Sequence, residues 1–293
     1  MLTKILQSPG DEAKRWLHGR GNCVEGYESI NIEWLPPIAM VVSYQQQDES
    51  WFAQIASQLM TFEQVQGVCL QKRYLPKSPV ESLTGSFDLP QYALESGLKY
   101  QLNIGQNQNF GIFLDMKNGR DWVRQHSQDK SVLNLFAYTC GFAVAALAGG
   151  ARFAVNLDMA RSSLNTGREN MRINGLDTKK AKFLAHDLFK SWGKLKKFGP
   201  YDMVIADPPN LQVGSFDIER DYPKIIRRLP ELVAAGGQAL LCLNTPWLGQ
   251  SFIKELMAEH CPDFEFVEAI ARPQACLEQN DDNGLKVLLF QRH

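Results

Sequence analysis

From residue 131 onward, short β-type segments alternate with helical segments, and this alternation limits the folds open to the chain. The strand-like runs lie at 132–136, 153–157, 182–185, 203–206 and 239–243. Strands that alternate with helices in this way predict a doubly wound parallel sheet. Two further apolar runs, 264–269 and 285–290, are typical of a closing pair of strands. We therefore predict an α/β fold with a Rossmann-like, mostly parallel sheet of about seven strands and an antiparallel edge.

The first hundred residues follow a different pattern. Segment 27–34 alternates polar and apolar residues, and strand or helix patterns follow at 38–44, 49–61 and 68–73. These patterns predict a small α+β module. Segment 76–92 contains three prolines and a glycine, which predicts a linker or surface loop. We expect a module over 1–100, with a possible role in substrate recognition, and a catalytic domain over 101–293.

Charge and composition narrow the function classes. The net charge of −1 argues against a strongly basic nucleic-acid-binding protein. Segment 117–200, however, carries 15 Lys and Arg against 6 Asp and Glu, which suits either a solvated surface or a phosphate-rich partner. The lysines that we expect to contact RNA phosphates are Lys190, Lys194, Lys196 and Lys197.

The cysteines and the apolar segments argue against a metal site and a membrane location. The six cysteines are scattered without a C-x-x-C pair, so we expect neither bound zinc nor a disulfide framework. No run of eighteen apolar residues occurs, and the first residues lack the apolar core of a signal peptide. We expect a cytoplasmic protein with no metal and no membrane partner. The sequence does not indicate an oligomeric state.

Acidic residues follow two neighbouring strands of the predicted sheet. Asp158 ends the second strand and Asp187 follows the third, while a turn of small residues, 137–141, follows the first. The turn is not G-x-G-x-x-G, which disfavours a dinucleotide. Each acid alone is better explained as the cap of the helix that follows it. Together, at the carboxyl ends of adjacent strands, they fit the ribose and adenine of an adenosine-bearing cofactor, with S-adenosylmethionine as the best candidate.

The four residues Asp207-Pro208-Pro209-Asn210 follow the apolar run that ends at Ala206. Proline fixes φ and has no N–H, so the neighbouring carbonyls are not drawn into a local turn and can face a ligand. Such a turn suits the binding of a planar nitrogenous ring at a methyl-transfer site. The alternative is that the two prolines only end a strand.

Several motifs together resemble a known family. They are Gly111-Ile112-Phe113-Leu114-Asp115 with Arg120, 134–139, 168–170 with 174–176, Asp207-Pro208-Pro209, 215–221 and 235–237. Residues 110–293 resemble class I S-adenosylmethionine-dependent methyltransferases, and more narrowly the bacterial large-subunit ribosomal RNA methyltransferases that modify guanine N7 or cytosine C5. The amino-terminal module matches this family much less clearly.

The resemblance implies roles for individual residues. Around the methionine part and the sulfonium it implies Asn134, Phe136, Tyr138 and Thr139, with Gly141 in the same turn. It implies Asp158 at the ribose and Asp187 with Leu188 at the adenine, and we expect Met159 to contact the cofactor as well. Asp207 would lie near the sulfonium and the transferred group. Phe113, Asp115 and Arg120 would form a lid, with Arg120 also able to contact RNA. For Phe113 core packing is an equal alternative, and for Asp115 with Arg120 a structural ion pair.

The target atom depends on whether a cysteine stands at the position that C5 chemistry requires. Methylation at cytosine C5 needs a thiolate that adds to the ring. In the resembling cytosine enzymes this cysteine lies seven residues beyond the second glycine of a Gly-Gly turn, and that position here is Asn244. Cys242 is two residues early, and a small buried strand residue is the simpler interpretation.

Methylation of a ring nitrogen such as guanine N7 needs no general base, because the nitrogen only has to be aligned with the methyl group and sulfur of the cofactor. We expect Pro208, Asn210 and Asn244 to contact the target nucleobase. An exocyclic amine is less favoured because positions 210 and 211 lack an aromatic residue. Methylation of rRNA at guanine N7 is our prediction. Cytosine C5, an exocyclic amine, a small molecule or protein substrate, and a non-catalytic assembly factor stay open as alternatives.

Overall fold

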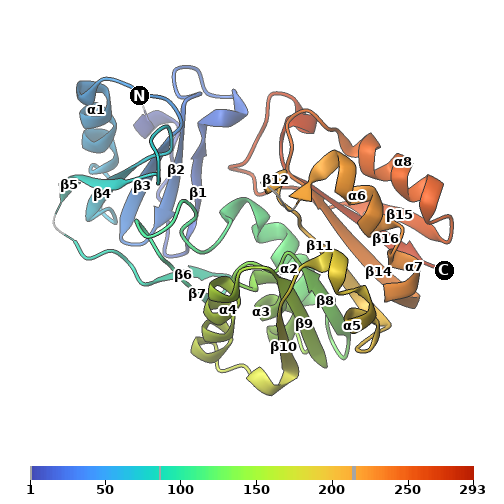
Figure 1. Cartoon of the computed structure of the whole chain (residues 1–293). Coiled ribbons are helices and arrows are strands. Elements are labelled where there is room, and N and C mark those ends of the chain that lie inside the picture. The colour runs from blue at the N-terminus through green and yellow to red at the C-terminus, as the bar shows by residue number, and fades with distance from the viewer. Residues whose placement is uncertain (1, 86, 213–215) are drawn as a thin grey trace. The chain divides into compact units, whose positions relative to one another are not determined.

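The computed structural model describes residues 2–85, 87–212 and 216–293, so Ser215 of the 215–221 motif lies outside the described residues. The chain divides into two compact units (Figure 1). The first unit runs to Lys117 and also includes Pro273–Asp281, and the second comprises Asn118–Arg272 and Asp282–His293. The division into a recognition module and a catalytic domain at residue 100 stays a prediction.

The first unit is built on a five-stranded sheet. Its strands, in spatial order, are β1 (Lys14–His18), β2 (Ile30–Leu35), β3 (Ile38–Ser43), β4 (Gly67–Lys72) and β5 (Val80–Gly85). Helix α1 (Glu49–Leu59) connects β3 to β4, which run parallel, and the other pairs are antiparallel. Every residue of β2 and β3 is buried, so these two strands form the centre of this unit's core.

The expectation of a loop over 76–92 was wrong. Strand β5 pairs with β4 along the sheet edge, and Pro79 precedes the strand, where it disturbs no ladder hydrogen bond. Its side chains are mostly exposed, so the segment lacks the apolar alternation that would have revealed it. A hairpin of β6 (Tyr92–Glu95) and β7 (Leu98–Gln101) follows, with positive φ at Ser96 and Gly97, as a tight hairpin turn requires.

The second unit contains a seven-stranded sheet. Its spatial order is β10 (Ala181–Ala185), β9 (Phe153–Asp158), β8 (Ser131–Leu135), β11 (Tyr201–Ala206), β14 (Val233–Leu243), β16 (Lys286–Arg292) and β15 (Phe264–Ala269). The first five strands are parallel, and β16 is antiparallel to both of its neighbours. This arrangement confirms the predicted fold class.

Helices cover the seven-stranded sheet, and all five residues of β8 are buried. The helices are α2 (Lys117–Gln125), α3 (Gly141–Ala148), α4 (Arg161–Ile173), α5 (Trp192–Lys196), α6 (Ile218–Ile226), α7 (Leu229–Leu232) and α8 (Gln250–His260). Helix α3 contacts α4, whereas α6 contacts α8 and α5 contacts α7. Parallel strands that are buried on both faces consist of continuous apolar residues, which explains why these strands could be predicted from the sequence.

Small elements complete the two units. The two-stranded ribbon of β12 (Leu211–Gln212) and β13 (Phe216–Asp217) follows β11. Short 3-10 helices lie at Leu2–Lys4, Gly19–Gly21, Leu114–Met116, Thr178–Lys180, Leu188–Lys190 and Asp281–Asn283. None of the helices in the described part of the chain has the length and apolar character needed to cross a bilayer.

Candidate active site

The loop after β8 holds three non-glycine residues in the left-handed region. Their φ angles are +57° at Phe136, +46° at Tyr138 and +61° at Cys140. Such conformations cost energy and persist only where neighbouring structure fixes them. The N–H of Ala137 donates to the Leu157 carbonyl at 3.0 Å. Gly167 of α4 lets Cys140 pack closely, because a Cβ there would overlap the thiol. The strained loop is therefore held by both neighbouring elements.

Other expected residues of this loop are mainly backbone contributors. Thr139 is buried, and its carbonyl accepts from the Asn170 side chain at 3.0 Å. Gly141 begins α3. Asn134 is buried within β8 and donates to the Asn156 side chain at 3.0 Å, so in this structure its carboxamide serves the sheet.

Asp158 and Asp187 lie at the carboxyl ends of β9 and β10, as predicted from the sequence. Asp158 accepts from the N–H of Tyr138 and from the N–H of Ala160, both at 2.8 Å. Asp187 accepts from the Phe189 N–H at 2.8 Å and caps the short helix that follows. Both carboxylates thus fix local turns. Each also keeps acceptor capacity for a ligand, because a carboxylate can accept about four hydrogen bonds.

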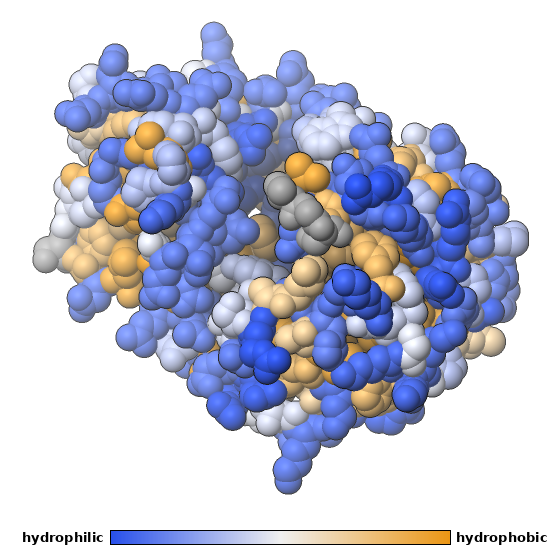
Figure 2. Space-filling view, in the orientation of Figure 1, coloured by the Kyte–Doolittle hydropathy of each residue, from blue (hydrophilic) through white to orange (hydrophobic). Residues whose placement is uncertain are grey.

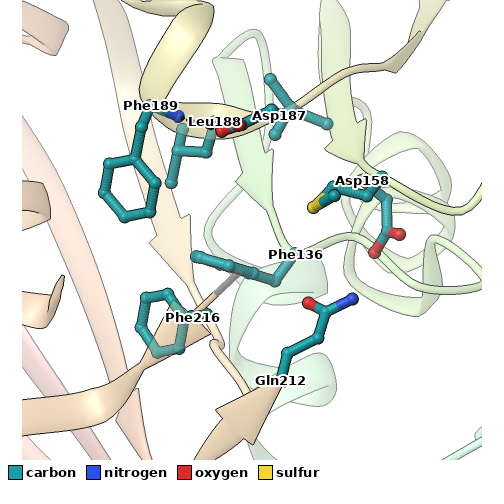
Figure 3. A pocket seen from close by; sticks show the side chains of 9 residues that line it. Phe136, Asp158, Asp187, Leu188, Phe189, Gln212 and Phe216 are labelled. Carbon is teal, nitrogen blue, oxygen red and sulfur yellow. Dashed lines mark hydrogen bonds between the residues drawn. The ribbon is translucent and has the colours of Figure 1, made fainter. Parts of the chain in front are cut away.

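These turns surround a pocket at the carboxyl ends of β9 and β10. The lining consists of apolar side chains, two carboxylates and one carboxamide, from Phe136, Leu157, Asp158, Met159, Asp187, Leu188, Phe189, Gln212 and Phe216 (Figure 3). The rings of Phe136 and Phe216 pack edge to face, with centroids 5.1 Å apart. In Figure 3 the Asp158 carboxylate and the Gln212 carboxamide reach toward the same part of the pocket.

The pocket brings together five of the residues expected at the cofactor, namely Phe136, Asp158, Met159, Asp187 and Leu188. It also includes Leu157, Phe189, Gln212 and Phe216, which the sequence reasoning missed. Gln212 and Phe216 come from the ribbon that follows the Asp207-Pro208-Pro209-Asn210 turn. Phe216 belongs to the 215–221 motif of the resemblance, which could have marked it as a site residue, whereas nothing in the sequence marked Gln212. A planar base among apolar side chains and a ribose beside Asp158 fit this lining, so the residues present suit an adenosine-bearing cofactor.

The Asp207-Pro208-Pro209-Asn210 turn leaves the sheet at the end of β11. Strand β11 pairs with β14 up to Ala206 and Leu241, so Asp207 and Cys242 are the next residues of two adjacent strands. The Tyr222 hydroxyl donates to the Cys242 carbonyl at 2.9 Å and to the Ala206 carbonyl at 3.5 Å. Burial raises the pKa of Tyr222 well above its usual value, and Cys242 and Asp207 add to this effect.

Two features of this turn bear on its chemistry. The Cys242 thiol is fully buried, and burial, followed by the nearby Asp207 carboxylate, raises its pKa well above the ordinary value. The Oδ1 of Asn210 is buried and has no hydrogen-bond partner among residues 2–85, 87–212 and 216–293. A buried acceptor without a partner is unusual and marks a position that a ligand can satisfy. Asn244 is exposed just beyond the end of β14.

The three residues expected to form a lid do not all belong to one unit. Phe113 and Asp115 lie in the first unit, where Phe113 is 41% exposed and Asp115 accepts from Arg15 at 3.3 Å. Arg120 lies in α2 of the second unit and is only 4% exposed. An RNA contact by Arg120 therefore requires its guanidinium to become accessible. The lid stays a prediction.

The lysines expected at RNA phosphates lie in the segment that follows β10 and ends one residue beyond α5. Lys190 is 84% exposed in its side chain and lies 3.7 Å from Asp187. Lys194 contacts His186 at 2.8 Å, and Lys196 pairs with Glu231 at 2.9 Å. Lys197 is exposed. In the described part of the chain all six cysteines are free, and no group of acids, histidines and cysteines is suited to a metal.

Comparison with known proteins identifies the family. A family model described as S-adenosylmethionine-dependent methyltransferase matches residues 14–291. The chain belongs to this family. The recognition of a methyltransferase and of its cofactor, S-adenosylmethionine, is thereby confirmed. The pocket after β8, β9 and β10 is the part of this methyltransferase whose lining fits that cofactor.

Individual relatives agree with this assignment. The methyltransferase is 32% identical over 173 residues to ribosomal RNA large subunit methyltransferase I of Aeromonas salmonicida, covering 58% of this chain and 44% of that protein. It is 35% identical over 150 residues to ribosomal RNA large subunit methyltransferase K/L of a Psychrobacter strain, covering 49% and 18%. The chain thus matches less than half of the length of these curated relatives.

A solved structure shows the same fold. SMU.776, a methyltransferase crystallised in complex with SAH, superposes with a TM-score of 0.85 at 23% identity, covering 95% of this chain and 75% of that one.

Proposed function

We propose that this methyltransferase acts on a base of large-subunit ribosomal RNA in the cytoplasm, at a ring nitrogen such as guanine N7. One observation supports a ring nitrogen as the target atom. An Asp-Pro-Pro-Asn turn lies beside Cys242, whose thiol is buried and not ionised. The names of the relatives, ribosomal RNA large subunit methyltransferases I and K/L, support the substrate class.

The residues of the site have a limited task in such a reaction. S-adenosylmethionine supplies, when bound, a methyl group on a sulfonium. Asp158 and Asp187 hold the adenosine part, and the carbonyls of the Pro208-Pro209 turn face the target base. Guanine N7 has an exposed lone pair and no proton to remove, so alignment suffices. Holding two reactants in line contributes about 7–11 kcal/mol. The Nδ2 of Asn210 can donate to the neighbouring guanine O6.

The state of Cys242 disfavours cytosine C5. That chemistry needs a thiolate within reach of the ring. Cys242 is fully buried in β14, and its raised pKa keeps it as a thiol near neutral pH. The position expected for a nucleophile holds Asn244, which cannot add to a base. A small buried strand residue is the role that the structure supports for Cys242.

A second candidate is an exocyclic amine. The unpartnered Oδ1 of Asn210 favours it, because an amino group is the donor that such an acceptor binds. Asp207, beside this turn, would then be positioned to accept the proton that the amine loses.

The exposed lysines from Lys190 to Lys197 support an RNA substrate. Lys190 lies beside Asp187, next to the cofactor pocket, so a phosphate bound there would bring a nucleotide close to the site. Lysine contacts of this kind position RNA without reading its sequence. The target base must leave its stack to reach the Asp207-Pro208-Pro209-Asn210 turn, as it does in other base-modifying enzymes.

Transfer of tritium from methyl-labelled S-adenosylmethionine to unmodified 23S rRNA tests the proposal. We expect label with the wild-type protein and with Glu268→Ala, an exposed acid on β15, and no label with Asp207→Ala. Methylation at guanine N7 makes the strand cleavable by borohydride and aniline at the labelled site. Label that survives this cleavage and is recovered as an N-methylated amine would favour the second candidate. Release of tritium from 5-tritiated cytidine would show C5 chemistry and contradict both.

A further inference from the structure

The loop that follows β14 carries an exposed tryptophan whose ring is held in place. The side chain of Trp247 is 60% exposed. Its Nε1–H donates to the Glu219 Oε1 at 3.0 Å, which fixes the orientation of the indole. Hydrophilic side chains make up most of the face shown in Figure 2. Single exposed apolar residues are common, so the significance of Trp247 rests on how its ring is held and on what lies near it.

A buried lysine fixes the backbone on both sides of this ring. The Nζ of Lys286, on β16, donates to the carbonyls of Thr245 at 2.6 Å and of Leu248 at 2.7 Å. It also donates to the carbonyl of Asp282, and the residue is only 3% exposed. Three carbonyl acceptors satisfy the three donors of an ammonium group, which is what a buried charge requires. The segment from Thr245 to Leu248 is therefore ordered before any ligand binds.

Hydrogen bonds place this loop near the Asp207-Pro208-Pro209-Asn210 turn. The Asn210 carbonyl accepts from the N–H of Ile218 at 3.0 Å. Glu219, the next residue, holds the Trp247 indole. In addition, the buried Oγ1 of Thr245, like the Oδ1 of Asn210, has no partner within the described ranges. The ring and two unpartnered polar atoms thus belong to the same region of the second unit.

We propose that Trp247 is the stacking platform for the target base. This inference rests on the proposed function, because it assumes an RNA base at the Asp207-Pro208-Pro209-Asn210 turn. Positions 210 and 211, where an aromatic residue would extend such a turn, hold Asn and Leu. Trp247 supplies the missing ring from another loop. A ring that is already fixed loses little conformational entropy when a base stacks on it.

Kinetics with the holoenzyme and 23S rRNA test this role. Base–aromatic stacking is worth about 1–3 kcal/mol, so Trp247→Ala should lower kcat/KM for the RNA about 5- to 150-fold. Trp247→Phe should recover most of that loss. S-adenosylmethionine affinity, measured by calorimetry, should stay within about twofold of the wild type in both variants. Val267→Ala, an exposed apolar residue on β15, is the matched control and should keep full activity. Equal kcat/KM for Trp247→Ala and the wild type would overturn the inference.

Fluorescence separates a failure of this inference from a failure of the proposed function. A single-stranded RNA dodecamer of mixed sequence, added with S-adenosylhomocysteine present, should quench the emission of the wild-type protein more than that of Trp247→Phe. This readout needs no turnover. Quenching that is the same in both proteins would refute the stacking role even if methylation occurs. Trp247-dependent quenching without methylation of rRNA would uphold stacking and remove the proposed reaction.

Discussion

Replacing Cys242 by alanine separates ring-nitrogen chemistry from covalent C5 chemistry. Burial, followed by the nearby Asp207 carboxylate, raises the pKa of the Cys242 thiol well above its usual value, so the thiol stays protonated near neutral pH. A group that is never a nucleophile leaves the rate almost unchanged when it is removed. We therefore expect kcat/KM within about twofold of the wild type. Removal of an essential nucleophile would instead lower kcat by about 10⁴- to 10⁶-fold.

The substitution also has a small predicted effect on stability. Cys242 is fully buried, and its loss leaves a space of about one methyl group, which costs roughly 1 kcal/mol in the free energy of unfolding. Cys261, another fully buried cysteine in the same unit, offers the matched control, and burial raises its thiol pKa to about 12. Cys261→Ala should show a similar loss of stability and the same activity.

Label transfer to unmodified 23S rRNA gives the rate, and urea denaturation followed by circular dichroism gives the free energy of unfolding. A gel in denaturing detergent then tests for a covalent complex with RNA that contains 5-fluorocytidine. The reasoning is refuted if Cys242→Ala stays folded but loses a thousandfold or more in rate while Cys261→Ala does not. A trapped complex that depends on Cys242 would refute it independently.

Three further outcomes are expected. Asp158→Ala should weaken S-adenosylmethionine binding about 10- to 100-fold in calorimetry, because a hydrogen bond to a charged group is lost, and unchanged affinity would remove Asp158 from the site. Asp221→Asn should lower the free energy of unfolding by about 2 kcal/mol, because Asp221 is buried and accepts from Arg220 and Lys224 at 2.7 Å. This pairing lowers the pKa of Asp221. The stabilisation by Asp221 is therefore complete above the ordinary carboxyl pKa and is lost as the pH falls, so the difference in unfolding free energy between variant and wild type should begin to shrink below about pH 4. A difference that grows in acid would contradict the pairing. Lys190→Ala should reduce the slope of log RNA affinity against log salt by about one in filter binding, whereas an unchanged slope would show that Lys190 contacts no phosphate.

The sheet and the positions of two pocket acids could be predicted from the sequence for a shared reason. Parallel strands buried on both faces give uninterrupted apolar runs, and Asp158 and Asp187 stand at or just after the ends of two such runs. The edge strand β5 was missed because its exposed side chains lack alternation. Burial of Arg120 was missed because a charged residue is ordinarily expected at the surface.

The contribution of Trp247 depends on contacts between distant parts of the chain. Its indole is held by Glu219, 28 positions away, and its loop is held by Lys286, 41 positions beyond Thr245. Neither contact follows a short sequence spacing. A single sequence reveals local patterns such as the Asp-Pro-Pro turn, whereas the contacts that hold the Trp247 loop form only when distant segments pack together.

The position of β16 has a consequence for how the enzyme matures during synthesis. This strand is made after β15 but inserts between β14 and β15, so β14 and β15 each have an unpaired edge until β16 arrives. The first residue of β16 is Lys286, which also orders the Trp247 loop. Insertion of β16 therefore completes the sheet and orders the proposed Trp247 stacking platform in the same step. A chain that lacks this strand would have neither a closed sheet nor the contacts that order the Trp247 loop.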